Sequence, residues 1–273
     1  MCEATTLETR PVAVSSGKYS VIRRGGIALV AIHPVLVDFA IDLALGIPDD
    51  FPLKARVTVG PHGTPLPPED GPHIGIQTEH FLDANGQEMF RTMSKYHKAK
   101  FIDGCDHVLE LSPANRPAYA MLRASKQRKI TYGPYVFPSR PVARTQGGTG
   151  LAFAGNVNPR RAEILASLGD SVVRLPRKTW GQDVHTAFLQ AAAVLNIHFK
   201  DSVVTEAPRL LKAYLAGKPV VSEALAEPIE MGRHAIPLGE AHEAARLDAV
   251  FDAFDHEIAR KFRFVDFLEK TLA

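Results

Sequence analysis

Apolar and polar positions follow two different periods along this chain, and one stretch shows both clearly. Residues 194–223 read VLNIHFKDSVVTEAPRLLKAYLAGKPVVSE. The first six alternate with period two, which predicts a strand that carries Asn196 and His198 on one face. The next apolar positions recur at helical spacing and predict a helix with one buried stripe, formed by Ala207, Leu210, Leu211, Tyr214 and Leu215. Gly217 ends this helix, and residues 219–221 begin a second buried strand.

The same two periods recur through the rest of the chain. In the first half we expect strands at 18–24, 27–32, 55–59, 73–77, 107–111 and 130–136, and helices at 36–45, 87–101 and 113–125. In the second half we expect further strands at 151–154, 172–175 and 234–238, and further helices at 160–168, 184–193 and 240–273. Residues 138–150, rich in Pro and Gly, predict a linker.

Strands that alternate with helices predict βαβ units and parallel sheets. We therefore expect an α/β fold of two Rossmann-like domains whose parallel sheets face a cleft. The predicted domains are residues 1–140 and 141–273, the second including the C-terminal helices.

Composition narrows the classes of protein. The chain has 273 residues, 45% of them hydrophobic, and a net charge of +2, which does not indicate a nucleic-acid ligand. Two cysteines are too few for a disulfide framework, which favours the cytoplasm. No apolar run approaches the roughly 20 residues that span a bilayer, and the first residues do not form a secretory signal. Neither HExxH nor a DxD triplet is present, so we expect no metal.

Glu206 and Arg209 fall in the first turn of the helix after residues 194–199, at the carboxyl edge of the expected sheet. Open α/β sheets bind ligands at that edge. A helix N-terminus favours anions, and an arginine adds a forked cation. We interpret Arg209 as a phosphate ligand and Glu206 as a ligand of a ribose or sugar hydroxyl. The alternative is a carboxylate that stabilises the helix dipole beside a surface arginine.

Other polar residues fall at the same edge. Asn196 and His198 lie on an otherwise apolar strand, where unbonded polar groups are costly. His198 either lines a donor pocket or is a core histidine bonded to neighbouring backbone. Residues 155–161, GNVNPRR, follow a strand and open a helix. Their glycine lets backbone N–H groups approach a phosphate that the arginines neutralise, or the segment is a solvated basic helix start.

Several further positions carry candidate chemistry. Trp180 precedes a helix, either as a platform for base stacking or as a core anchor. Glu79 and His80 follow the strand at 73–77, where an acid–base pair can activate an acceptor hydroxyl. His33, at the exit of the strand at 27–32, competes for that role, and a structural histidine is the alternative for both. Glu110 alternates within its strand, which allows it to face water.

Several motifs keep a common order between Gly75 and Glu223: IQTEH, DHVLELS, FAGNVNPRRAEIL, VLNIHF and EAPRLLKAYLAGKPVVSE. In this order they resemble GT-B-fold glycosyltransferases of bacterial type, with a group 1-like C-terminal domain. The resemblance implies that the first domain binds the acceptor, the second binds a nucleotide sugar, and no metal is needed. It places seven residues in or near the donor site: Gly155, Asn156, Arg160, Arg161, Glu206, Arg209 and Glu223. Many retaining members carry a glutamate where this chain has Lys212, so the stereochemical outcome stays open.

The expected function is a cytoplasmic glycosyltransferase of hexosyltransferase type. It would move a sugar from a UDP- or GDP-sugar to the hydroxyl of a glycan, a small molecule or another polymer, without a metal or a further cofactor. Three arginines would balance the diphosphate charge as it departs: Arg160, Arg161 and Arg209. Glu79, His80 or His33 would orient or deprotonate the acceptor. The alternatives are a non-catalytic nucleotide- or sugar-binding module, a partner subunit of an active transferase, or a dehydrogenase or epimerase, which the absence of GxGxxG disfavours.

Overall fold

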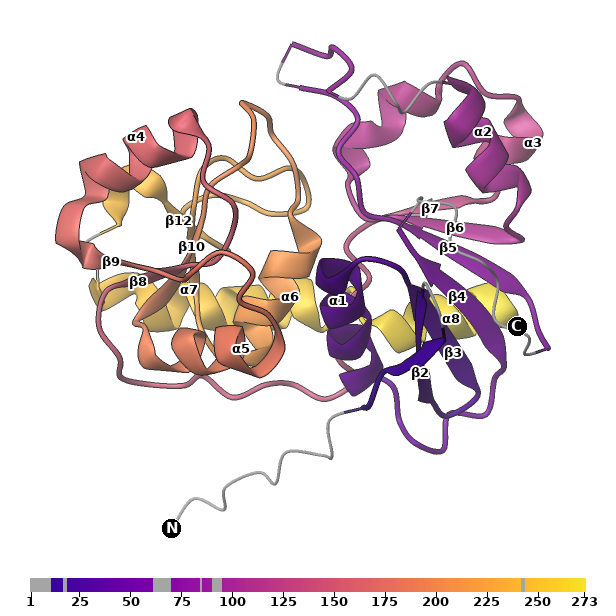
Figure 1. Ribbon diagram of the computed structural model, residues 1–273, viewed down its shortest axis with the longest axis horizontal. Helices are drawn as coiled ribbons and strands as arrows, with labels where there is room; N and C mark the ends of the chain where they lie inside the picture. Colours follow the sequence, from indigo (N-terminus) through magenta and orange to yellow (C-terminus); the bar gives the residue numbers. More distant parts are fainter. Residues whose placement is uncertain (1–10, 17–18, 61–69, 84, 90–94, 242–243) are drawn as a thin grey trace.

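The computed structural model describes residues 11–16, 19–60, 70–83, 85–89, 95–241 and 244–273. Two α/β lobes lie side by side, each built on one sheet (Figure 1). Helices α1 and α6 meet where the lobes touch. The predicted α/β class is therefore confirmed, and the two sheets decide where each polar side chain is delivered.

The sheet of the first lobe keeps its strands in chain order. They are β1 (Val14–Ser16), β2 (Tyr19–Arg24), β3 (Ile27–Ala31), β4 (Ala55–Val59), β5 (His73–Gln77), β6 (His107–Glu110) and β7 (Ile130–Tyr132). From β3 to β7 all pairs are parallel, while β1 and β2 form an antiparallel edge. Every residue of β3 and β5 is buried, as expected for strands covered on both faces. The prediction missed the short β1.

The helices of the first lobe are shorter than predicted. They are α1 (Pro34–Leu45), α2 (Lys95–Asp103), a 3-10 helix (Pro113–Tyr119) and α3 (Ala124–Gln127). The helix predicted at 87–101 is wrong at its start, because Glu88 forms a β-bridge with Leu82; residues 90–94 lie outside the described part. The helix predicted at 113–125 is also wrong, because Pro117 lacks the N–H that an α-helix needs. The strand predicted at 130–136 stops at Tyr132, before a Gly-Pro pair.

The sheet of the second lobe is fully parallel, in the order β12-β11-β10-β8-β9. Its strands are β8 (Leu151–Phe153), β9 (Val172–Arg174), β10 (Ala193–Asn196), β11 (Val220–Ser222) and β12 (Ile236–Pro237). The chain passes from β8 outward to β9 and then returns to place β10 on the other side of β8. The strand order therefore reverses between β8 and β10, and such a switch point opens a crevice for ligands.

The helices of the second lobe follow the predicted order, although the helix predicted at 184–193 ends at Gln190 and Ala193 already belongs to β10. They are α4 (Pro159–Leu168), α5 (Gly181–Gln190), α6 (Ala207–Leu215), α7 (Leu247–Phe254) and α8 (Phe264–Leu272), with short 3-10 segments at Gly169–Ser171, Leu238–Glu240 and Ala244–Arg246. Four positions of the predicted α6 stripe are buried, and Leu215 is partly buried. The helix predicted at 240–273 is interrupted, because a π-helix (Asp255–Ala259) and a turn separate α7 from α8.

The core is continuous across the linker. Phe137 donates a backbone hydrogen bond to Phe262 (3.2 Å) and accepts one from Phe264 (2.9 Å), which ties α8 to the end of the first lobe. The Phe137 ring also meets the rings of Tyr214 and Phe254 edge-on. One buried cluster thus includes residues of both lobes. The domain limits at 1–140 and 141–273 stay a prediction.

Candidate functional site

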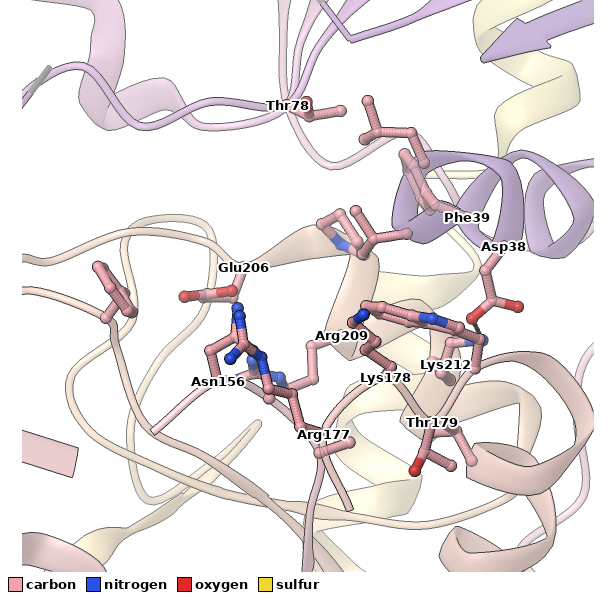
Figure 2. A pocket seen from close by; sticks show the side chains of 18 of the residues that line it. Asp38, Phe39, Thr78, Asn156, Arg177, Lys178, Thr179, Glu206, Arg209 and Lys212 are labelled. Atoms are coloured by element: carbon pink, nitrogen blue, oxygen red, sulfur yellow. Dashed lines mark ion pairs between the residues drawn. The ribbon is translucent and has the colours of Figure 1, made fainter. Parts of the chain in front are cut away.

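A cleft of about 380 Å³ lies between the lobes, within the size range of small-molecule sites. Figure 2 shows Thr78 and Phe39 of the first lobe on one side and Glu206 and Arg209 of the second on the other. The first lobe contributes α1 and the exit of β5, and the second contributes the exits of β8 and β9 and the starts of α5 and α6. The carboxyl edges of both sheets therefore face this cleft, at the switch point of the second sheet.

Two guanidinium groups converge beside Gly155, the second residue after β8. A Cβ atom at Gly155 would lie 3.3 Å from Nη1 of Arg161 and 3.5 Å from Nη2 of Arg209. Both guanidinium groups also lie over the ring of Phe153, 5.6 and 5.9 Å from its centroid. Two cations held this close, at the edge where strands end, create a local field that attracts an anion. A larger residue at position 155 would push into that space.

Arg161 is held by the main chain. Its guanidinium donates to the carbonyl oxygens of Asn156 (2.7 Å), Ile197 (2.6 Å) and His198 (3.2 Å). These bonds join the segment after β8 to the segment after β10. Burial, followed by the charge of Arg209, lowers the pKa of Arg161 to about 10. Arg161 is therefore a fixed, cationic wall of the cleft.

Arg209 is oriented by the residue that ends β10. It donates to Oδ1 of Asn196 and, more weakly, to the carbonyl of Ile197 at 3.4 Å. Asn196 in turn donates to the Ser222 hydroxyl at 2.8 Å and is fully buried. Asn196 is thus hydrogen-bonded inside the second lobe, where it positions Arg209. It does not line the cleft itself.

Glu206 precedes α6 with a left-handed backbone, φ 50° and ψ 37°. The sequence predicted it inside the first helical turn, which is wrong by one position. Few residues other than glycine adopt this conformation, and those that do gather at functional sites. Burial by itself would raise the pKa of Glu206, but Arg209, a hydrogen bond with His198 and the nearby His80 hold this pKa well below its usual range. Glu206 is therefore ionised in the cleft.

His198 contacts the Glu206 carboxylate from outside the cleft. Its Nε2 lies 2.9 Å from the carbonyl oxygen of Ala224, and its Nδ1 lies 3.3 Å from Oε1 of Glu206. The ring is buried and is not among the cleft-lining residues. Of the two interpretations from the sequence, the placement matches a core histidine bonded to neighbouring backbone, here with the added contact to Glu206.

His80 brings a second imidazole to the same carboxylate from the first lobe. Burial lowers the pKa of His80, although the charge of Glu206 acts in the opposite direction. Its Nδ1 is buried and has no hydrogen-bond partner among the described residues. His80 is therefore neutral at pH 7, and it lies just behind the cleft, because it is not among the cleft-lining residues. Glu79 lines the cleft beside it.

Arg160 and Glu223 form a pair outside the cleft. Arg160 donates twice to the carboxylate of Glu223, and also to the carbonyl of His198 at 3.1 Å. Glu223 further accepts the backbone N–H of His198 at 2.7 Å. Neither residue is among those lining the cleft. The predicted contact of Arg160 with a diphosphate has no support in this arrangement, because Arg160 does not line the cleft.

The remaining predicted residues separate into two groups. Trp180 lines the cleft at the start of α5 with 42% of its surface exposed, so it is not a core anchor. Gly155 and Asn156 also line the cleft. His33 is exposed at the start of α1 and is not a cleft-lining residue.

Sequence reasoning missed two cations at the exit of β9. Arg177 and Lys178 line the cleft on the same side as Arg209 (Figure 2). Lys178 has a positive φ of 67°, uncommon for a residue with a side chain. The sequence does indicate these residues, because positions 176–179 follow a predicted strand and so fall at the carboxyl edge of the sheet, where ligands bind.

An ion-pair cluster at the base of the cleft was also missed. Lys212 on α6 lies 2.9 Å from Oδ2 of Asp38 and 2.5 Å from Oδ2 of Asp42, both on α1. Both aspartates are buried. The two carboxylates are one helical turn apart on one face of α1, so a single cation can bind both and hold the lobes together.

Glu110 does not face water, contrary to one expectation from its alternation. Its carboxylate is fully buried and accepts hydrogen bonds from the backbone of Ser112 (3.0 Å), the amide of Asn115 (3.0 Å) and the hydroxyl of Tyr119 (2.5 Å). Burial raises the pKa of Glu110 to about 8, although these hydrogen bonds oppose the shift.

Among the described residues, His, Cys, Asp and Glu side chains do not gather in threes in a way that could hold a metal ion. In the same part of the chain, no helix is both long and apolar enough to cross a membrane. Fold and site together define an α/β protein of two Rossmann-like lobes with a basic cleft between them.

Comparisons with known proteins give matches among solved structures alone: no protein-family model and no curated protein matches. A TarM structure is 14% identical with a TM-score of 0.42, covering 80% of this chain and 53% of that one. A variant of S. aureus TarM in complex with fondaparinux, alpha-GlcNAc-glycerol and UDP is 12% identical with a TM-score of 0.40, covering 80% and 51%. A GtfA/B complex bound to UDP and GlcNAc is 10% identical with a TM-score of 0.34, covering 93% and 64%. The chain spans about half the length of the TarM chains.

Proposed function

We propose that this protein is a glycosyltransferase with a GT-B arrangement, which moves a sugar from a UDP- or GDP-sugar to an acceptor hydroxyl without a metal. The observation that carries the proposal is the convergence of Arg161 and Arg209 beside Gly155, at the switch point of the second sheet. Arg177 and Lys178 add two cations to the same wall. A wall with four cations suits a diphosphate, whose charge grows as the sugar leaves.

The opposite wall suits an acceptor alcohol. His80 is neutral and offers a buried ring nitrogen, so it is our candidate for the general base. Glu206 lies between the two walls, because it lines the cleft and interacts with both Arg209 and His80. We assign Glu206 to a hydroxyl of the sugar or ribose, and its charge keeps Arg209 in place. Trp180, half-exposed at the rim, is the candidate platform for the nucleotide base.

The first experiment is a thermal-shift panel of UDP, GDP, their sugars and GlcNAc, followed by a transfer assay with any stabilising donor. A ligand at 100 times its Kd raises the free energy of unfolding by about 2.7 kcal/mol. EDTA should leave transfer unchanged. If no nucleoside diphosphate raises the melting temperature of the native protein, the donor assignment is wrong.

The matched variants are Arg209→Ala and Arg174→Ala. Arg174 lies in β9 of the same lobe and is exposed. Arg209→Ala should lower kcat by about 10²- to 10³-fold, because it removes a preorganised cation from the leaving group. Arg174→Ala should change kcat by less than about twofold. Equal activity of the two variants would remove Arg209 from the donor site.

A second candidate function is a non-catalytic nucleotide-sugar-binding module or a partner subunit of an active transferase. The observation that favours it is the bonding of Lys212, whose ammonium group forms ion pairs with Asp38 and Asp42. A residue used to join the lobes does not contact a ribose at the same time. Slow hydrolysis of a UDP- or GDP-sugar by the purified protein, lost in Arg209→Ala, would decide for the enzyme.

A further inference from the structure

A second, much smaller chamber lies behind the cleft, between the two lobes. The first lobe forms it from the exits of β5 and β6, and the second lobe from residues 205–208 at the start of α6. Its volume is about 10 Å³, close to the roughly 10–15 Å³ that the centre of one water molecule needs. Thr78, Glu79 and Glu206 line both the chamber and the cleft, so the two spaces adjoin.

The chamber gathers polar atoms that lack partners. Oγ1 of Thr78, Nδ1 of His80, Oγ of Ser112 and Oγ1 of Thr205 are buried without a hydrogen-bond partner among the described residues. All four residues line this one chamber. Ser112 is 2% exposed and Thr205 is fully buried. A buried polar group without a partner loses its hydration and gains nothing in return, so four such groups around one space indicate a guest that bonds to them.

The chemistry of the walls defines that guest. A hydroxyl group donates one hydrogen bond and accepts others, and the three wall hydroxyls and the imidazole can supply complementary partners. The Glu206 carboxylate borders the chamber and disfavours an anion. The volume leaves no room for a hydrated cation or for a ring.

We propose that this chamber is a subsite for one small hydroxyl group, bonded by Thr78, His80, Ser112 and Thr205. In the free protein the guest is a water molecule. During transfer, a step that rests on the proposed function, the guest is the hydroxyl of the acceptor. Its oxygen forms the new bond to the sugar carbon, its proton passes to His80, and the bond from that carbon to the diphosphate oxygen breaks, with the electron pair leaving on the diphosphate beside Arg209.

The first test needs no nucleotide sugar. A high-resolution crystal structure of the free protein should show one water in the chamber, within hydrogen-bond distance of at least two of the four atoms. Thr205→Val should then lower the melting temperature, because the water loses a partner. If the chamber holds no water, valine would replace a hydroxyl that has no partner, and the melting temperature would rise. Such a rise would overturn the proposal. This result is independent of whether the protein transfers sugars.

The second test measures the acceptor. Thr205→Val and Ser112→Ala should each raise the KM for the acceptor about tenfold and leave the KM for the donor within about twofold. Thr131→Val, a matched change in β7 away from both spaces, should alter neither constant. An unchanged acceptor KM in both chamber variants, with the crystallographic water present, would limit the subsite to water and overturn its role for the acceptor.

Discussion

The two lobes face the same cleft with opposite chemistry. On the second lobe, Arg161 already donates to three main-chain carbonyls, and Arg209 is bonded through Asn196. On the first lobe, the Thr78 hydroxyl and, just behind the cleft, the His80 ring nitrogen are buried without partners among the described residues. The second lobe therefore presents cations whose hydrogen bonds to the protein are already made. The first lobe has polar atoms that still lack a hydrogen-bond partner.

The difference follows from the two sheets. The second sheet reverses its order between β8 and β10, which opens a crevice where cations can gather and still bond to carbonyls. The first sheet keeps chain order, so its polar residues arrive one strand at a time, after β5 and after β6. A buried cation must be bonded to be tolerated, whereas a hydroxyl without a partner costs much less. The cations of the second lobe therefore have their hydrogen-bond partners, whereas these two neutral polar atoms of the first lobe do not.

The largest expected effect tests the neutral wall. His80→Gln should lower kcat of the proposed transfer by roughly 10³-fold, because general bases contribute about 10²- to 10⁴-fold. In the native protein, the proposed transfer should slow as the pH drops through the pKa of His80, which lies below its ordinary 6.5 because of burial. The acidic limb should be absent in His80→Gln. A His107→Gln control, at the partly buried start of β6, should keep both rate and profile. An unchanged rate in His80→Gln would assign the base to another residue.

The next effect tests what holds the walls together. Lys212→Met should lower the free energy of unfolding by about 3 kcal/mol, because it removes the cation that two buried aspartates share. Urea unfolding measures this change. Adding Asp38→Asn and Asp42→Asn to the methionine variant should recover part of the loss, since the like charges are then gone. If Lys212→Met unfolds at the same urea concentration as the native chain, the lobes are held by the apolar core alone.

A smaller effect concerns the buried acid of the first lobe. The folded pKa of Glu110, about 8, lies above the ordinary 4.5. Its neutral form favours the folded state, so this stability is present in full below pH 4.5 and is lost as the pH rises to about 8. The free energy of unfolding should fall by up to about 1.4 kcal/mol per pH unit in that window.

Glu110→Gln should flatten that dependence when unfolding is measured at pH 5, 6.5 and 8. Glu257→Gln is a useful control, because hydrogen bonds from Arg233 and His234 lower the pKa of Glu257 to about 2. Its titration lies below the window, so the slope between pH 5 and 8 should persist in this variant. A slope that persists equally in Glu110→Gln would contradict the assignment.

The smallest effect probes the rim of the charged wall. Trp180 is the single tryptophan of the chain, so its fluorescence reports directly on a stacked base. A nucleotide that binds should quench this emission, and Trp180→Ala should weaken binding about tenfold, which corresponds to roughly 1.4 kcal/mol. Isothermal calorimetry gives the affinity of both proteins. Unchanged emission at saturating nucleotide would place the base elsewhere.

Much of the candidate site follows from local pattern. Gly155 after a strand, Arg209 near a helix start and His80 after a strand all lie at carboxyl edges, and each was assigned from that position. Arg177 escaped because it carries no motif, although its position obeys the same rule. Arg160 shows the limit of the rule: it neighbours Arg161 in sequence, but the helix turns it toward Glu223 and out of the cleft.

The sequence by itself determined the succession of strands and helices, the α/β class and the edges at which polar residues emerge, because periodicity and Gly or Pro punctuation act within a few residues. Only the tertiary structure decided which cations share the cleft and that Lys212 forms ion pairs with α1. It also decided that Glu110 and four polar atoms without partners lie around the small chamber. Those outcomes depend on burial and, as for Lys212 with Asp38 and Asp42, on partners that lie far away in the chain. Hydration and charge are set by what surrounds a group in space, and local pattern does not record that.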